Sequence, residues 1–249
     1  MRISLVILTC NQRELTLRCL RSLKSFIQDP SCELILVDNG STDGTADAVQ
    51  TEFHFVKLIK LDTNRGVAAG RNVGLRQAVG RHLMILDNDT IADAQTIYAL
   101  SDFLERYPDV GMVAPRLVSP QGEIQTSYKR FPGLGVKIRN VIGSRHNTGI
   151  ATEAPATATE PFYLIGAAQM FPREVYERAG GLDENIFYGP EDADFCMAVR
   201  EQGLRVVYYP ALTIIHDWQR ATTKRIFSTA ARRHAAGLFY FYNKHKRWF

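Results

Sequence analysis

The sequence predicts an α/β protein in which helices cover both faces of a mostly parallel sheet. Over the first ninety residues, short apolar runs alternate with segments of helical spacing. The runs are unbroken, as expected for strands that are covered on both faces, and strands that alternate with helices form parallel βαβ units. The predicted strands are 3–8, 34–37, 56–61 and 82–86, and the predicted helices are 15–26, 45–53 and 67–79.

The rest of the chain predicts further elements in a less regular order. Pro108 ends a predicted helix over 92–107, and an Ala- and Thr-rich segment over 148–160 is predicted to be a loop. The other predicted elements are short strands over 111–128, a strand over 162–168, a helix over 172–179, a helix from 190 to 203 and a strand over 204–209. Because no internal repeat or linker interrupts this pattern, we expect one domain over 1–249.

Length and composition narrow the class of protein. The 249 residues suffice for one α/β domain, and 45% hydrophobic with 22% charged residues is ordinary for a soluble globular protein. The first apolar run is too short for a membrane span or for the full plan of a signal peptide. The four cysteines have no metal-ligand spacing, so we expect reduced thiols in a cytoplasmic protein.

Polar side chains follow three of the predicted strands. Thr9 and Asn11 follow the first strand, Asp38 follows the second, and Asp87 and Asp89 follow the fourth. In a parallel sheet, ligands bind beyond the carboxyl ends of the strands. An Asp or Asn at such a place can also start a turn or cap a helix, but that role does not explain the pair of aspartates.

The pair Asp87 and Asp89 forms an Asp-x-Asp motif at a strand end. The turn that follows lets two carboxylates converge on one hard cation, and their oxygens suit Mg²⁺ or Mn²⁺, which in turn bind a diphosphate. The tripeptide alone is common, so its position carries the prediction. His216 follows another apolar stretch; a lone histidine is more often structural, but a neutral imidazole also suits such a metal.

Three carboxylates in four positions, Glu191, Asp192 and Asp194, open the predicted helix after Pro190. Acidic residues in a first turn are favoured by the helix dipole, so a purely structural role is a serious alternative. Three of them exceed what capping requires. A carboxylate with carboxylate neighbours has a raised pKa and can act as a base.

Glycines and arginines flank the start of the predicted helix 67–79. The segments are 64–66 (Asn-Arg-Gly) and 70–74 (Gly-Arg-Asn-Val-Gly). They match neither a Walker A loop nor the GxGxxG pattern, and Gly74 is expected to allow close packing on the sheet. An arginine at this helix start is well placed to bind phosphate or to order the acidic loops.

These segments together resemble the family 2 glycosyltransferases of the GT-A fold. The matching stretches are 6–11, 35–43, 64–66, 70–74, 86–89, 180–184 and 189–194. Each stretch by itself is weak evidence for the family, but their order and spacing together are specific to it. The resemblance covers nearly the whole chain. The sequence is most similar to the rhamnosyltransferase-like branch, which builds bacterial surface polysaccharides.

The resemblance implies a Rossmann-like GT-A sheet and a set of site residues. It divides the chain into a nucleotide-binding half over 1–90, an acceptor and catalytic half over 91–220 and a basic, aromatic C-terminal helix over 221–249. The implied roles are nucleoside contacts for Thr9, Asn11 and Asp38; nucleotide contacts for Arg65 and Gly66; metal ligation by Asp87, Asp89 and His216; a sugar pocket lined by Gly166 and Ala167; catalytic base for Asp192; and acceptor orientation by Glu191. One departure is that Gly189 and Pro190 separate the aromatic residues Phe187 and Tyr188 from the acidic pair.

The implied reaction is inverting transfer of a sugar from a UDP-, dTDP- or GDP-linked donor to an acceptor hydroxyl, with Mn²⁺ or Mg²⁺ as cofactor. The expected acceptor is a glycan or a lipid-linked glycan of a bacterial surface polysaccharide or glycolipid. Two alternatives stay open: a nucleotidyltransferase that makes a nucleotide-sugar, and a non-catalytic nucleotide- or sugar-binding module. The acidic cluster at 191–194 has no obvious role in the reaction of a nucleotidyltransferase.

The C-terminal segment combines basic and aromatic residues, although the formal net charge of the chain is only +4. Such a segment suits an anionic membrane surface, so peripheral association with the inner face of the membrane is one expectation. A terminal helix packed on the domain by its aromatic face is the other. Nucleic-acid binding is not expected, because the basic residues match no nucleic-acid-binding motif.

Overall fold

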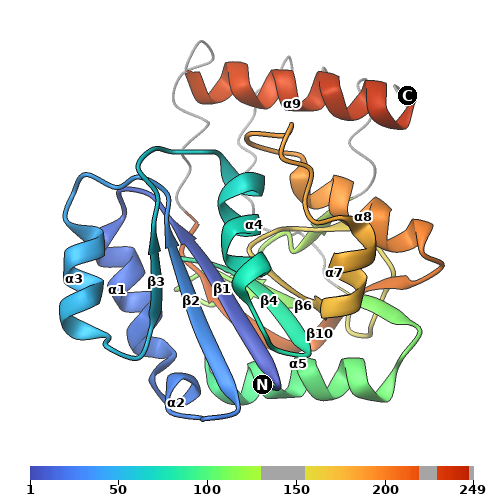
Figure 1. The fold of residues 1–249 in the computed structure, drawn as a ribbon. Coiled ribbons are helices and arrows are strands. Elements are labelled where there is room, and N and C mark those ends of the chain that lie inside the picture. Colours follow the sequence, from blue (N-terminus) through green and yellow to red (C-terminus); the bar gives the residue numbers. More distant parts are fainter. Residues whose placement is uncertain (130–154, 219–228, 247–249) are drawn as a thin grey trace.

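A computed structural model of the chain describes residues 1–129, 155–218 and 229–246, and within these ranges the centre is an eight-stranded sheet (Figure 1). Its order is β3-β2-β1-β4-β9-β6-β10-β5. Strands β3, β2, β1 and β4 are mutually parallel, β6 and β10 are parallel to each other, and β9 runs antiparallel between the two groups. The sheet is therefore mostly parallel, as predicted.

The strands of this sheet are β1 (Ile3–Thr9), β2 (Cys32–Asp38), β3 (Lys57–Lys60), β4 (His82–Asp87), β5 (Thr90–Ile91), β6 (Val110–Val118), β9 (Ala168–Pro172) and β10 (Arg205–His216). A separate antiparallel pair consists of β7 (Tyr128–Lys129) and β8 (Tyr163–Leu164). The helices are α1 (Arg13–Ser22), α2 (Lys24–Ile27), α3 (Thr45–Glu52), α4 (Val67–Gln77), α5 (Ala94–Arg106), α7 (Arg173–Ala179), α8 (Glu191–Glu201) and α9 (Thr229–His245).

Two apolar layers hold helices against opposite faces of the sheet. Along β1, Ile3, Leu5 and Ile7 point into the layer covered by α1, α2, α3 and α5. Val6, on the other face, points into the layer covered by α4, α7, α8 and α9. This arrangement explains the unbroken apolar strands, because alternate side chains are buried on both sides.

The glycines of α4 let that helix lie close to the sheet. A Cβ atom on Gly74 would come within 2.5 Å of Val6 Cγ1, and one on Gly70 would come within 2.6 Å of Leu8 Cδ1. The packing role predicted for Gly74 is confirmed.

The prediction was wrong around residue 168. The expected strand over 162–168 is broken by a turn at Gly166 and Ala167, and a central strand, β9, occupies Ala168–Pro172, most of which was assigned to no element. The helix predicted over 172–179 is present as α7. The apolar run was correct, but local periodicity cannot show that Ala168–Pro172 pairs with β4 on one side and β6 on the other.

Other differences are smaller. The predicted helix 15–26 is divided into α1 and α2, and the predicted strand 204–209 continues as β10 to His216. The predicted C-terminal helix 221–249 is present as α9, whereas 221–228 and 247–249 lie outside the described residues, as does the first part, 148–154, of the predicted loop. No described helix has the length and apolar character that a bilayer span requires.

Candidate active site

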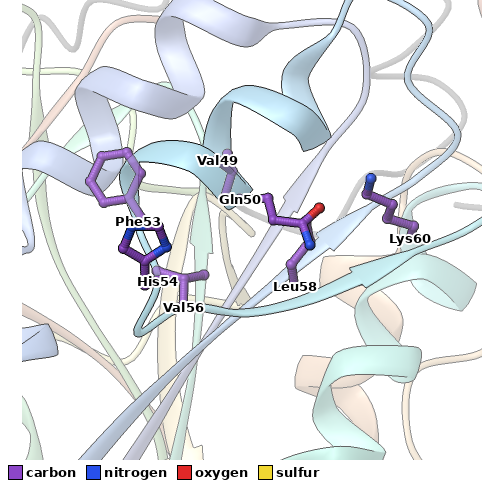
Figure 2. A pocket seen from close by; sticks show the side chains of 7 residues that line it. All are labelled: Val49, Gln50, Phe53, His54, Val56, Leu58 and Lys60. Carbon is purple, nitrogen blue, oxygen red and sulfur yellow. The ribbon is translucent and has the colours of Figure 1, made fainter.

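A surface pocket of about 540 Å³ lies between α3 and β3 (Figure 2). Its lining is Val49, Gln50, Phe53, His54, Val56, Leu58 and Lys60. This set contains no carboxylate and none of the predicted site residues, so the pocket lacks the paired acidic side chains that the sequence predicts for the site. The chemistry predicted from the sequence lies instead at the ends of β1, β2, β4 and β10.

Strand register brings the predicted metal residues together. In the parallel ladders Leu8 pairs with Asp87, and in the antiparallel pair His216 faces Thr90. The Thr90 hydroxyl donates to the Asp87 carbonyl (2.7 Å) and thereby closes the turn between β4 and β5. That turn carries Asp89 toward the end of β10.

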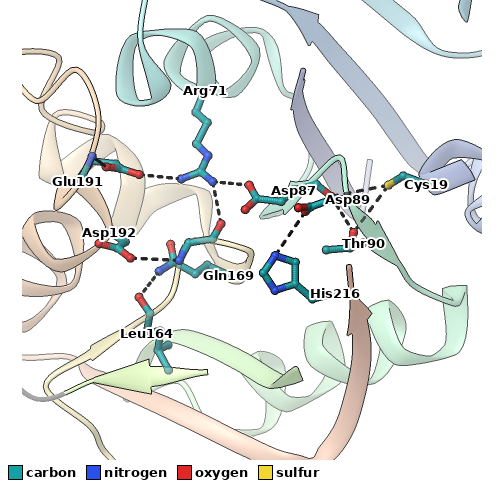
Figure 3. Close-up of polar contacts among 12 residues, drawn as sticks. Cys19, Arg71, Asp87, Asp89, Thr90, Leu164, Gln169, Glu191, Asp192 and His216 are labelled. Atoms are coloured by element: carbon teal, nitrogen blue, oxygen red, sulfur yellow. Dashed lines mark hydrogen bonds and ion pairs between the residues drawn. The ribbon is translucent and has the colours of Figure 1, made fainter. Parts of the chain in front are cut away.

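The side chains of Asp87, Asp89 and His216 form a group that fits a divalent cation (Figure 3). Their potential ligand atoms all lie within 4.8 Å of one another, and His216 Nε2 is 3.4 Å from Asp89 Oδ1. Asp89 Oδ1 is buried and accepts no hydrogen bond within the described residues. A buried carboxylate oxygen without a donor is costly, and a cation satisfies it.

The electrostatics of this group agree with cation binding. Burial lowers the pKa of His216, but the nearby carboxylate of Asp89 prevails and raises it. Desolvation and the charge of Asp89 raise the pKa of Asp87 against the opposing effect of Arg71. Negative charge is thus concentrated where two carboxylates and an imidazole meet, which is the donor set that Mg²⁺ or Mn²⁺ accepts.

Gln125 orients the imidazole and was missed by the sequence analysis. Its side-chain oxygen lies 2.9 Å from His216 Nδ1, and its amide donates to the His216 carbonyl (2.9 Å). A hydrogen bond at Nδ1 leaves Nε2 to face the carboxylates, the usual way in which a second group fixes a histidine ligand. No local pattern around residue 125 signals this role.

Arg71 is the second residue that the sequence analysis left unassigned. It is only 4% exposed, and its guanidinium donates to Asp87 Oδ1 (2.6 Å), to the Gly166 carbonyl (2.9 Å) and to Glu191 Oε1 (3.4 Å). Burial opposes its charge, but Asp87 and Glu191 prevail and raise the pKa of Arg71. Figure 3 shows this guanidinium between the metal group and the start of α8.

The three carboxylates of the acidic cluster have different surroundings. Glu191 is buried; it accepts from Arg71 and from the Gly189 amide (2.5 Å), and burial with the charge of Asp192 raises its pKa to about 7. Asp194 is buried against Lys244 (2.9 Å) and His245 (2.7 Å) of α9.

Asp192 differs from both neighbours. It is partly exposed, and within the described residues its carboxylate accepts only from the backbone amides of Ala193 (2.8 Å) and Gly166 (3.3 Å). Since the other two acids are engaged by basic side chains, Asp192 is the carboxylate of the cluster best placed to receive a proton.

The turn at Gly166 and Ala167 joins the two halves of the site through its backbone. Gly166 donates to Asp192 and accepts from Arg71, and the Ala167 carbonyl accepts from the Asp87 amide (2.9 Å). The Ala167 side chain is buried in the core, so its methyl group does not face a ligand. Any contact with a sugar comes from this backbone.

The residues predicted to meet the nucleoside lie around the ends of β1 and β2. Asp38 is buried and accepts from the Ser41 amide (2.9 Å), and Asn11, at a positive φ of 53°, accepts from the Thr42 amide (2.7 Å). The hydroxyl of Thr9 bonds Thr16 (2.7 Å) and is buried. Thr9 therefore supports the site from within, whereas Asn11 is exposed to a ligand.

Arg65 and Gly66 lie next to these strand ends. The Arg65 side chain is exposed, and its amide donates to Asn39 Oδ1 (2.9 Å) at the end of β2. Gly66 has φ of +90°, and a Cβ atom there would come within 2.6 Å of the Phe187 carbonyl oxygen. The glycine thus lets the segment before α8 approach the start of α4.

Two known proteins are similar to this chain in sequence. An L-rhamnosyltransferase of Mycobacterium tuberculosis, described as N-acetylglucosaminyl-diphospho-decaprenol L-rhamnosyltransferase, is 25% identical over 93% of this chain and 81% of its own length. A dTDP-rhamnosyl transferase, RfbF, of Shigella flexneri is 24% identical over 85% of this chain and 67% of its own.

A solved structure of a Pyrobaculum calidifontis mannosyltransferase in complex with GDP-Man and Mn²⁺ superposes with a TM-score of 0.62 at 25% identity. The match covers 89% of this chain and 58% of that one, so this chain spans less than two thirds of the solved protein. The superposition confirms the predicted GT-A fold.

Residues 4–180 match the profile of Glycosyl transferase family 2. That stretch contains the strand ends with Asp38, Asp87 and Asp89, as well as Arg71 and the Gly166 turn. The chain belongs to glycosyl transferase family 2.

Proposed function

We propose that this protein transfers a sugar from a nucleoside diphosphate donor to an acceptor hydroxyl, with inversion at the anomeric carbon and with a divalent cation. The observation that carries the proposal is that the group of Asp87, Asp89 and His216, whose ligand atoms lie within 4.8 Å of one another, is linked through Asp87 and Arg71 to Glu191 at the start of α8. A diphosphate site and a base are thereby held in one rigid frame. A non-catalytic binding module would not need the link from Arg71 to the acidic start of α8.

Separate groups of residues are proposed to contact the cation, the nucleotide and the sugar. Asp87, Asp89 and His216 would hold Mn²⁺ or Mg²⁺, which when bound neutralises the charge of the diphosphate leaving group. Asp38, Asn11 and the Arg65–Gly66 turn surround the nucleotide. Gly166 and Ala167 border the sugar through their backbone.

The proton transfer is assigned to Asp192. Its carboxylate takes the proton of the acceptor hydroxyl while the oxygen attacks the anomeric carbon from the face opposite the diphosphate; the new bond forms as the bond to the diphosphate breaks. Arg71 neutralises Glu191 and Asp87 on either side of the reaction. Glu191 lies too deep to orient an acceptor directly, so we propose that it fixes Arg71 and the Gly189 turn.

The relatives indicate which substrates to test first. Two of them are rhamnosyltransferases, one is named for a dTDP-linked donor and one for a diphospho-decaprenol acceptor. We therefore propose dTDP-rhamnose as the first donor and a lipid-linked glycan as the first acceptor, with UDP- and GDP-linked sugars as the comparison set.

The donor site is tested by titration calorimetry of UDP, dTDP and GDP with Mn²⁺. We expect one nucleotide to bind tightly, and we expect EDTA or Asp89→Ala to weaken it by at least about 10-fold, a loss of about 1.4 kcal/mol. Asp47→Ala, at an exposed aspartate of α3, is the matched control and should bind as wild type does. If no nucleotide binds the wild-type protein, the donor-site assignment is wrong.

We also propose that the outward face of α9 contacts an anionic membrane. Arg232, Phe239 and Lys246 are exposed, with Phe239 at 61%, and their spacing of seven residues places them on one side of the helix. The sequence from 229 to 246 contains no acidic residue. Figure 1 shows α9 lying across one end of the molecule, above α4 and α8, where such a surface is accessible.

Flotation with liposomes tests this contact. Vesicles that contain phosphatidylglycerol should carry the protein at low salt. The double variant Arg232→Gln/Lys246→Gln should bind about 30-fold less, because each basic residue near an anionic surface contributes about 1 kcal/mol. Tyr107→Ser, at an exposed aromatic residue after α5, is the control for non-specific binding to vesicles and should float as wild type does. Equal flotation of wild type and double variant would contradict the assignment.

A further inference from the structure

The inward face of α9 contacts the segment that leads into the acidic cluster. Phe241 and Tyr242 are buried in the apolar layer that also contains Phe195 of α8. A Cβ atom on Gly237 would collide with the carbonyl oxygen of Gly189, so the helix and the segment 183–190 touch backbone to backbone. The proposed membrane contact uses the opposite face.

Charged groups close this contact at the C-terminal end of α9. Lys244 Nζ lies 2.7 Å from Asp183 Oδ2 and 2.9 Å from Asp194 Oδ2, so one ammonium joins the two ends of the segment that precedes and begins α8. The Asp194 side chain is 4% exposed, whereas that of Lys244 is 36% exposed. Burial opposes the charge of Lys244, but its hydrogen bonds to Asp183 and Asp194 prevail and raise its pKa.

The opposite side of the same segment rests on the nucleotide half. The Phe187 carbonyl accepts from the Val67 amide (2.8 Å) at the start of α4, and the Phe187 ring packs against Gly66. From α9, the Arg233 guanidinium covers that ring at 3.8 Å from its centroid. Segment 183–190 is thus held between α9 and the predicted donor site.

The base lies directly beyond this segment. Asp192 and Asp194 both belong to the first turn of α8, and Gly189 is fixed to Glu191 by a hydrogen bond. A restraint on Asp183 and Asp194 therefore sets the position of the turn that carries Asp192. Small displacements of a reacting group are costly, and a shift of about 1 Å can lower a rate by about 10²-fold.

We infer that Lys244 is a positioning residue, which fastens α9 to Asp183 and Asp194 and thereby holds Asp192 in place against the donor site. The inference rests on the proposed function, and it assigns to α9 a part in catalysis in addition to its apolar packing. Lys244 does not touch a substrate in this account. It acts through the segment 183–190 and the first turn of α8.

The test compares Lys244→Met with Lys244→Arg and with Lys24→Met, a control at an exposed lysine of α2, all assayed in detergent micelles so that membrane binding plays no part. Asp194 keeps His245 and Asp183 keeps Tyr240 as partners in all three variants, so folding should persist. We expect Lys244→Met to lower kcat about 10-fold or more. This kcat is calculated from the concentration of protein that binds nucleotide, and the Kd for the nucleotide with Mn²⁺ should not change. Lys244→Arg, which can still bridge both carboxylates, should restore most of kcat, and Lys24→Met should match wild type.

Amide hydrogen exchange supplies a readout that is independent of activity. Exchange over 183–194 should accelerate in Lys244→Met and stay unchanged in Lys24→Met. With an active wild type, a kcat in Lys244→Met within twofold of wild type, or exchange over 183–194 that does not change, would overturn the inference. A wild-type protein that binds nucleotide but transfers no sugar would instead contradict the proposed function, and the role of Lys244 in catalysis with it.

Discussion

Replacing Asp192 by asparagine is expected to lower turnover by about 10²-fold or more, because the amide cannot take the proton of the acceptor hydroxyl. The nucleotide should bind almost as tightly as to wild type, since Asp192 is not part of the Asp87, Asp89 and His216 group. Steady-state kinetics with the donor that gives the fastest wild-type turnover, together with calorimetry of its nucleotide, separate the two effects.

The fold should survive this change. The new side-chain oxygen can still accept from the Ala193 amide, and only the longer bond from Gly166 is lost, at a cost of about 1 kcal/mol. Asp47→Asn, at an exposed aspartate of α3, is the isosteric control and should retain full turnover. Near-normal turnover in Asp192→Asn would remove Asp192 from the role of base.

The sequence could predict the metal group because its signal is local. Asp87 and Asp89 directly follow an apolar run. Ligands bind beyond the carboxyl ends of parallel strands, so aspartates at such a strand end are candidates for a binding site. His216 was a weaker case: only the pairing of β10 with β5 brings its imidazole beside Asp89. The ligand set was therefore predictable, whereas its assembly required the topology.

Arg71, Gln125 and Lys244 could not be assigned in the same way. Each acts on residues far away in the chain, as when Arg71 reaches Glu191 or Lys244 reaches Asp183. An arginine inside a helix or a lysine near a C-terminus is ordinarily a solvated surface residue. For Arg71 the sequence offered one clue, its place near the start of the predicted helix 67–79, where an arginine can order acidic loops.

The error at β9 has a related cause. Antiparallel insertion of Ala168–Pro172 between β4 and β6 places the Gly166 turn beside Asp87, and no periodic pattern reports a pairing between distant segments. The turn matters more than the strand for function, because its backbone meets Arg71 and Asp192.

Arg71→Met is expected to lower the free energy of unfolding by about 3 kcal/mol, because it leaves the buried carboxylate of Glu191 and the partly exposed one of Asp87 without their charged partner. Arg76→Met is the matched control: it lies on the same helix and pairs with Glu184 at the surface, so it should cost no more than about 1 kcal/mol. Urea unfolding of the metal-free proteins, followed by tryptophan fluorescence, measures both.

The loss in Arg71→Met should also depend on pH in a defined direction. The folded pKa of Glu191 is about 7, above the ordinary 4.5, although Arg71 opposes this rise. Without Arg71 the folded pKa rises further, so ionised Glu191 destabilises the fold at pH 8, whereas at pH 5 the folded protein keeps the proton. The difference from wild type should therefore be larger at pH 8 than at pH 5. An equal loss at both pH values would mean that Arg71 stabilises the fold by packing alone, and that the charge link from the metal group to the acidic turn of α8 contributes nothing.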